Sequence, residues 1–212
     1  MDGTLLDSIR AWHAAESQVT AAAGIVLSKE ERDELNTLTL VEAGAWFHEK
    51  FGVLGDGDEV SRSIMEYMLA FYRSGAKANP GAVEFVRACH EAGAPMCVLS
   101  SSPKAFIRAG IPSAGLGEFF PDDHFMISAE DRGLTKRAPE TFDYVCSLLG
   151  TAPEDTWLFD DSWYALATAH DVGLKCAGIY SLDGCGTHEE LARYCDVVAD
   201  SFAELDPKGF LS

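Results

Sequence analysis

The sequence predicts an α/β protein, in which helices cover both faces of a Rossmann-like parallel sheet and a small α-helical domain is attached. Three observations support this class. The 212 residues are 47% hydrophobic, which suits one core with a small accessory domain. Residues 8–75 carry apolar positions at helical spacing and lack strand-like runs. After residue 76, short apolar runs alternate with helical segments almost to the end.

The first part is expected to form four helices joined by short loops, which makes a small antiparallel unit. The second of these helices has a clear start, because Ser28 is followed three residues later by Glu31, the pattern of a capping box. Glycines at the ends of the other segments are typical helix stops. The expected helices cover residues 8–24, 28–35, 40–52 and 58–75.

The second part is expected to build the sheet. Strands are predicted over residues 95–102, 124–128, 156–161, 174–180 and 196–200. Helices are predicted over residues 81–93, 141–150 and 163–173. The chain therefore divides into an α/β core, residues 1–10 and 76–212, and a helical domain, residues 11–75. In parallel sheets of this kind, ligands bind at the carboxyl ends of the strands.

Composition excludes several functions. The formal charge of −18, from 34 acidic and 16 basic residues, repels polyanions, so binding to nucleic acid or to an anionic membrane is not expected. The sequence has no apolar run of about 20 residues and no signal-peptide pattern, which indicates a cytoplasmic protein. The six cysteines form no C-x-x-C pair and are expected to be reduced core residues. A monomer or a weak homodimer is expected.

Polar residues follow the predicted strands where ligands are expected. They are the turn at Asp2, the serines Ser100 and Ser101, the lysine Lys136, and the acidic pair Asp160 and Asp161. Singly, each has an ordinary explanation: the acidic pair caps a helix, the serines form a turn, and the lysine is solvated. Together, carboxylates, hydroxyls and a lysine form a pocket that can hold a hard cation and a phosphate.

The segments that carry these residues are MDGTLLDS, VLSSSP, TKRAPETF and LFDDS. In this order and spacing they resemble the four motifs of the haloacid dehalogenase-like (HAD) hydrolases, over nearly the whole chain. The helical segment resembles the α-helical cap of β-phosphoglucomutase-like and phosphoglycolate-phosphatase-like members. The resemblance implies a Mg²⁺-dependent phosphatase that hydrolyses a small phosphorylated metabolite, of the sugar phosphate or phosphoglycolate type, through an aspartyl-phosphate intermediate.

The resemblance also implies a role for each residue. Asp2 matches the general acid/base, whose backbone carbonyl touches the metal. Ser100 matches the hydroxyl that binds a phosphoryl oxygen, helped by the backbone N–H groups that follow, beginning at Ser101. Lys136 matches the lysine that neutralises nucleophile and phosphate. The ligands of Mg²⁺ are expected to be Asp160 and Asp161.

The family's D-x-D-G-T motif places the nucleophilic aspartate two residues before Asp2, a position that the sequence does not contain. The apolar strand that precedes this motif is missing too, which would leave a slot between two unpaired sheet edges. We therefore expect a truncated chain that is inactive as written. A nucleophile-free relative that binds a ligand or a partner is the rival hypothesis. The sequence also leaves open a β-phosphoglucomutase-like mutase, and it does not separate sugar phosphate, phosphoglycolate and nucleotide monophosphate.

Overall fold

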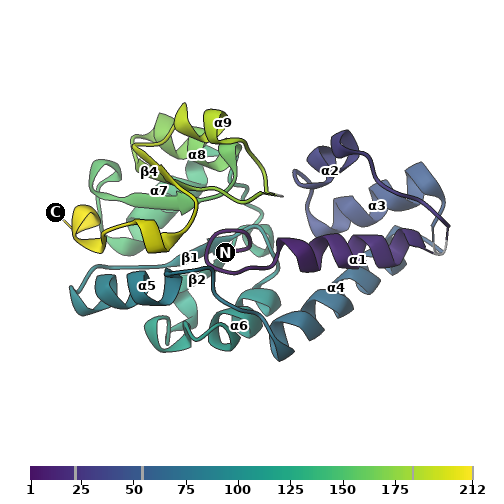
Figure 1. Ribbon diagram of the computed structural model, residues 1–212, viewed down its shortest axis with the longest axis horizontal. Coiled ribbons are helices and arrows are strands. Elements are labelled where there is room, and N and C mark those ends of the chain that lie inside the picture. Colours follow the sequence, from purple (N-terminus) through teal and green to yellow (C-terminus); the bar gives the residue numbers. More distant parts are fainter. Residues whose placement is uncertain (22, 54, 183, 212) are drawn as a thin grey trace.

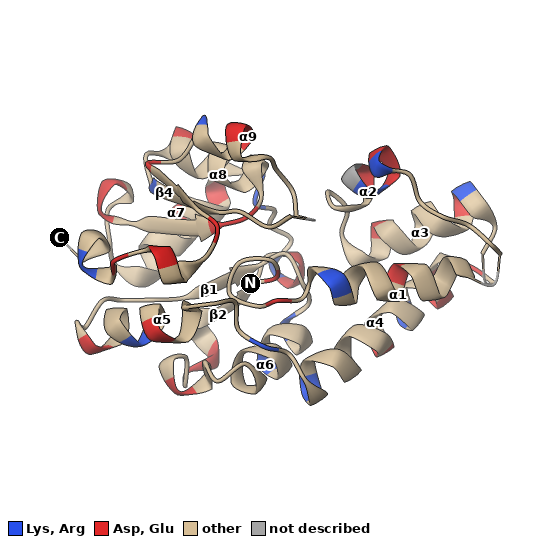
Figure 2. Ribbon diagram, viewed as in Figure 1, with Lys and Arg blue, Asp and Glu red and all other residues tan. Residues whose placement is uncertain are grey.

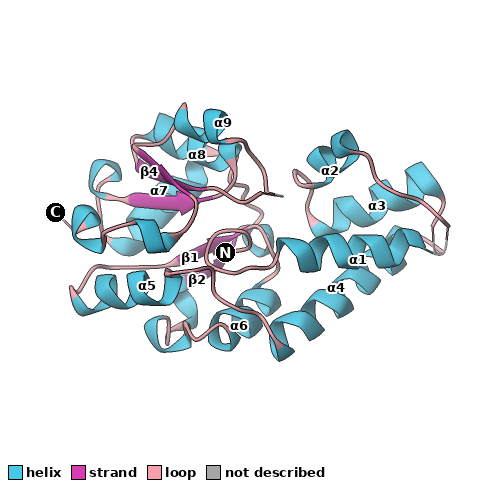
Figure 3. Ribbon diagram, in the orientation of Figure 1, coloured by secondary structure: helices cyan, strands magenta, loops and turns pink. Residues whose placement is uncertain are grey.

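The structure is a computed structural model that describes residues 1–21, 23–53, 55–182 and 184–211, and the backbone alone of residue 33. Helices surround short strands in one part of the molecule, and a second part is entirely helical (Figure 3). The α-helices are α1 (Ile9–Ala21), α2 (Lys29–Leu35), α3 (Leu40–Phe51), α4 (Gly57–Ser74), α5 (Ala82–Glu91), α6 (Lys104–Ser113), α7 (Pro139–Leu149), α8 (Trp163–Val172) and α9 (His188–Ala192).

The strands form two separate parallel sheets among the described residues. The first pairs β1 (Val98–Ser100) with β2 (Met126–Ser128). The second has the order β3 (Trp157–Asp160), β4 (Lys175–Ile179) and β5 (Val197–Ala199). The α/β class with parallel strands is therefore confirmed, but as two sheets whose edges β1 and β3 share no ladder.

The predicted elements occur in the expected order, with ends that differ by a few residues. The capping box is present: the Glu31 backbone N–H donates to Ser28 Oγ, and the Ser28 N–H donates to Glu31 Oε2. Two helices, α6 and the short α9, had not been delimited from the sequence. In α6, Gly110 and Pro112 interrupt the helical pattern, which explains why periodicity did not reveal it.

Helices α1 to α4 lie together at one end of the molecule, away from the strands (Figure 1). Helices α3 and α4 pack closely because Gly44 has no side chain; a Cβ there would overlap Ser61 Oγ and the Gly57 carbonyl oxygen. One cluster of buried apolar residues continues from this unit into α6 and β1. The helical unit is thus joined to the sheet region by shared packing.

Residues 1–8 form a compact turn that lies between the two sheets at the junction with the helical unit (Figure 1). Leu6 is fully buried and forms isolated bridges with Asp2 and Ala78. The side-chain amide of Asn79 donates to the backbone carbonyls of Gly3 and Thr4, at 3.0 and 2.6 Å. These contacts fix the backbone on either side of Gly3 and so position Asp2.

An apolar cavity of about 240 Å³ separates the sheets. Its walls come mainly from the edge strands β1 and β3 and from the segments next to them, including Met96, Val98, Leu158 and Phe159. Two further clusters of buried residues lie on the β3–β4–β5 side, around α7 and α8 and around α5. The sheet region therefore has a divided core with a slot between two strand edges.

The surface charge, the helices and the cysteines can be compared with the expectations from the sequence. Acidic residues are scattered over the helices and loops of both parts (Figure 2). Every described helix is too short or too polar to span a lipid bilayer. All six cysteines are free thiols; Cys89, Cys146 and Cys176 are buried, as expected of core residues, whereas Cys97, Cys185 and Cys195 are partly exposed.

Candidate active site

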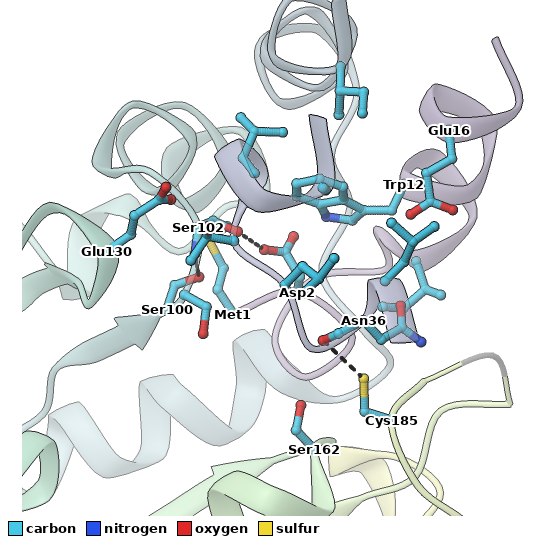
Figure 4. A pocket seen from close by; sticks show the side chains of 18 of the residues that line it. Met1, Asp2, Trp12, Glu16, Asn36, Ser100, Ser102, Glu130, Ser162 and Cys185 are labelled. Carbon is cyan, nitrogen blue, oxygen red and sulfur yellow. Dashed lines mark hydrogen bonds between the residues drawn. The ribbon is translucent and has the colours of Figure 1, made fainter. Parts of the chain in front are cut away.

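Asp2 lies at the centre of a group of hydroxyl donors. Its Oδ1 accepts hydrogen bonds from Ser8 Oγ, at 2.7 Å, and from the Tyr72 hydroxyl. Its Oδ2 accepts one from Ser102 Oγ, at 2.8 Å (Figure 4). Burial and the neighbouring Asp2 carboxylate raise the pKa of Tyr72, which keeps this hydroxyl a donor. Three donors from three elements thus hold one carboxylate in a defined orientation.

The loop after β1 places the serine run beside Asp2. Ser100 is buried at the carboxyl end of β1, and its Oγ accepts a hydrogen bond from the Ser102 backbone N–H, at 3.1 Å. Ser101 is exposed but also borders the site cavity. Pro103 then serves as the N-cap of α6, so the loop ends at a helix N-terminus, where backbone N–H groups favour an anion.

Lys136 and Asp160 form a buried ion pair, with 2.6 Å between Nζ and Oδ2. Burial disfavours the charge on Lys136, but Asp160 outweighs it and raises the lysine pKa. Burial likewise opposes the charge on Asp160, and Lys136 outweighs it and lowers the aspartate pKa. Both groups are therefore ionised near neutral pH. The other Asp160 oxygen accepts the Ser162 backbone N–H, at 3.0 Å.

Asp161 lies against the N-terminal turn. Its Oδ1 accepts a hydrogen bond from Thr4 Oγ1, at 2.9 Å. Gly3 has a positive φ of 69°, and a Cβ at this position would overlap Asp161 Oδ2. Burial, and then repulsion from Asp160, raise the pKa of Asp161 to about 7. This carboxylate is therefore destabilised in its charged form unless a cation lies beside it.

The donor set at this edge fits a hard divalent cation. Asp160 and Asp161 supply carboxylate oxygens, and the raised pKa of Asp161 is the signature of a buried acid that a cation would stabilise. The described residues contain no cluster of three or more His, Cys, Asp or Glu side chains arranged for a metal. Mg²⁺ commonly uses one or two carboxylates and completes its shell with water and phosphate oxygens.

These residues border one cavity of about 160 Å³. On the sheet side its lining includes Asp2, Ser100, Ser101, Lys136 and Asp161. Asp160 lies behind Lys136 as its ion-pair partner. The structure thus brings all six residues singled out from the sequence to one place, while their roles stay predictions.

Helices of the helical unit supply the opposite wall. Trp12 and Glu16 of α1 project toward the cavity, and Asn36 lies near them (Figure 4). Glu16 is buried, and burial raises its pKa to about 7, although the nearby Arg32 opposes this shift. The cavity therefore has a sheet side built for an anion and a helical side that carries an acid.

Several residues of the site were missed from the sequence. Ser8 and Ser102 lie within the quoted motifs, so their hydroxyls were visible but had no assigned task. Tyr72 and Glu16 are on helices that were interpreted as packing elements, and nothing in the sequence links them to Asp2. Only the folded arrangement of α1 and α4 shows that they face the site.

The sequence model of the haloacid dehalogenase-like hydrolases matches residues 1–173. The chain belongs to this family of hydrolases, as the motifs had indicated. Its curated relatives are phosphatases, so the class of enzyme is a phosphoric monoester hydrolase.

Three similar proteins illustrate the relationship. A phosphoglycolate phosphatase of Vibrio vulnificus is 25% identical, over 97% of this chain and 91% of its own length. A chloroplastic 5-amino-6-(5-phospho-D-ribitylamino)uracil phosphatase of Arabidopsis thaliana is 30% identical over 105 residues, which are 50% of this chain and 27% of that enzyme. The crystal structure of CbbY from Rhodobacter sphaeroides with phosphate has a TM-score of 0.80 at 24% identity, over 97% of this chain and 93% of CbbY, and shows a common fold.

Replacing Gly3 by alanine should destabilise the protein more than the same change at Gly24. Both glycines have a positive φ, near 69° and 68°, so alanine is strained at either position, by about 1 kcal/mol or more. At Gly24 a Cβ meets nothing within 4 Å, whereas at Gly3 it meets Asp161. Urea unfolding should show that Gly3→Ala lowers the free energy of unfolding by at least about 1 kcal/mol more than Gly24→Ala. An equal loss of the free energy of unfolding in the two variants would contradict the close contact between Gly3 and Asp161.

Replacing Glu16 by glutamine should stabilise the protein in a pH-dependent way. Because the folded pKa of about 7 lies above the ordinary value of 4.5 for glutamate, the folded state holds the Glu16 proton more tightly, and stability falls as pH rises through this window. Glu16→Gln removes that loss. Its advantage over the parent should grow between about pH 5 and pH 8, by up to about 3 kcal/mol. Urea unfolding at both pH values measures this difference in the free energy of unfolding, with a change at an exposed residue, Glu49→Gln, as the control. A difference that does not depend on pH would contradict the raised pKa of Glu16.

Proposed function

We propose that this chain carries the site of a Mg²⁺-dependent phosphatase that hydrolyses a small phosphomonoester through an aspartyl-phosphate intermediate. The observation that carries the proposal is the convergence of Asp2, Ser100, Lys136 and Asp161 on one cavity, with Asp160 held by Lys136. Phosphoryl transfer depends on charge neutralisation, in-line positioning and a proton source, and these side chains supply groups for each.

In the first step a carboxylate attacks phosphorus and the P–O bond to the leaving group breaks. The leaving oxygen takes a proton from Asp2, whose carboxyl is held by Ser8, Tyr72 and Ser102. In the second step Asp2 accepts a proton from water as that water attacks the phosphorus of the aspartyl-phosphate. Inorganic phosphate leaves and the carboxylate is regenerated.

The phosphoryl group is bound by the other residues. Ser100 and the backbone N–H groups of the following loop donate to its oxygens, and Lys136 neutralises their charge. Asp160, Asp161 and the backbone carbonyl of Asp2 would hold Mg²⁺. When bound, this ion allows a carboxylate and a phosphate to approach despite their like charge.

The attacking carboxylate is proposed to belong to an apolar strand that ends two residues before Asp2. The slot between β1 and β3 supports this, because it is apolar, is bordered by two strand edges without a shared ladder, and has Met1 in its lining. A strand placed there would pair with both edges and join the two sheets.

A second candidate, which the sequence leaves open, is a protein that binds a phosphorylated ligand without turnover; the cavity lined by Ser100, Lys136 and Asp161 would serve such binding as well. The remaining parts of the proposal follow from the sequence interpretation. Residues 11–75 act as a cap over the α/β core of residues 1–10 and 76–212. The protein works in the cytoplasm, as a monomer or a weak homodimer.

An extended chain tests the function. Two variants of the protein carry an added N-terminal strand of about five apolar residues. One further residue joins this strand to Met1, and it is aspartate in one variant and asparagine in the other. Release of phosphate from small phosphomonoesters with Mg²⁺ should occur with the aspartate form alone. In that form Asp2→Asn should lower kcat by about 10²- to 10⁴-fold, since a general acid/base is lost.

Three results would contradict the proposal. Equal phosphate release by the asparagine form would show that no added carboxylate is needed. Absence of turnover by a folded aspartate form that still binds phosphate would favour the binding protein. A strict need for a bisphosphate activator would identify a mutase instead.

A further inference from the structure

The helical wall of the site cavity contains an acid whose hydrogen-bonding capacity is unused. Glu16 of α1 is 8% exposed and borders the cavity together with Trp12 and Asn36 (Figure 4). Its Oε2 is buried and has no hydrogen-bond partner among the described residues. A buried carboxylate with an oxygen that lacks a donor is unfavourable, so a donor that reaches the Glu16 carboxylate from the cavity would stabilise it.

The neighbouring arginine does not meet this need. Arg32 Nη1 lies 3.6 Å from Glu16 Oε2, too far for a hydrogen bond, and Nη1 also lacks a partner among the described residues. The arginine nevertheless balances part of the acid's charge. A neutral donor, rather than a second cation, therefore suits Glu16.

A second unsatisfied acid borders the cavity from the sheet side. Glu130 follows β2, and its Oε2 is buried without a hydrogen-bond partner in the described part of the chain. Figure 4 shows Glu130 near Ser100 and Ser102, and Glu16 on the far side of Asp2. Acceptors from two walls thus border the same space.

The cations near the cavity are already engaged. Among its described lining residues the only lysine or arginine is Lys136, which is paired with Asp160. Lys50 of α3 contacts Glu31 and Glu34 instead, at 3.1 and 3.8 Å. A leaving group that carries a carboxylate or a second phosphate would meet Glu16 and Glu130, because the nearby cation Arg32 lies against Glu16 and does not border this cavity.

We propose that the cavity selects phosphomonoesters whose leaving group is an uncharged polyol or sugar, and that Glu16 rejects leaving groups with a carboxylate. This selectivity rests on the proposed function, because it assumes that the phosphoryl group occupies the sheet side. Hydroxyl groups of the leaving group donate to the carboxylates of Glu16 and Glu130 where these border the cavity, and Trp12 covers the carbon skeleton of the leaving group. Glu16 is then a specificity-determining residue.

Binding to the 212-residue chain tests the proposal without turnover. The ligands are sn-glycerol 1-phosphate and D-3-phosphoglycerate, which share the configuration at C2 and differ in a single group, CH₂OH against carboxylate. With Mg²⁺ at about pH 8, calorimetry should give a Kd at least about tenfold lower for glycerol phosphate. Glu16→Gln should reduce the ratio of the two Kd values to about threefold or less, mainly through tighter binding of phosphoglycerate. The Kd for inorganic phosphate should stay within about twofold.

The matched control is Glu49→Gln, which removes an exposed acid of α3 that does not border the cavity. It should leave the ratio unchanged. Equal affinity for the two esters in the parent protein, or the same narrowing in both variants, would overturn the selectivity while phosphate binding still supports the phosphatase site. Failure of folded protein to bind inorganic phosphate would overturn the proposed function and the selectivity together.

Discussion

The ion pair between Lys136 and Asp160 is the interaction on which the site depends. Lys136 follows β2 of one sheet, and Asp160 ends β3 of the other, so the 2.6 Å contact ties the carboxyl ends of two sheets that share no ladder. Thr4 makes a second tie when it donates to Asp161. Both contacts lie at the edge where ligands bind in such folds, while the apolar slot separates the strands behind them. Polar contacts thus hold the site together where backbone pairing is lacking.

Much of the fold and the sheet side of the site could be predicted from local patterns. Capping residues such as Ser28 act within one helical turn, so they are visible in a short stretch of sequence. Asp2 lies in a turn, and Ser100 and Asp160 directly follow apolar runs, so the adjacent residues indicate their positions at the sheet edge. The helical side could not be predicted in this way. The contact of Tyr72 with Asp2 spans 70 positions and depends on how α4 packs. Glu16 had the pattern of an ordinary helix residue, and only packing shows its unsatisfied oxygen.

The two walls of the cavity have different chemical tasks. On the sheet side, Lys136, the serine loop and the N-terminus of α6 favour an anion, whereas Glu16 on the helical side disfavours a second one. Relatives at about 25% identity share the family, and their named substrates do not fix the substrate of this chain. In the proposed function, the side chains of α1 and of the segment that joins α2 to α3 recognise the leaving group, and those of the sheet edge carry out the chemistry.

The most direct test of the account is whether this edge binds phosphate together with Mg²⁺. Titration of the 212-residue protein with inorganic phosphate, followed by ³¹P NMR with and without Mg²⁺, measures it. We expect Mg²⁺ to lower the Kd for phosphate about tenfold or more. Asp161→Asn should abolish this effect, whereas Asp143→Asn, a change at an exposed residue, should leave it intact. A phosphate affinity that is independent of Mg²⁺, or equally dependent on it in the Asp161→Asn variant, would contradict the account.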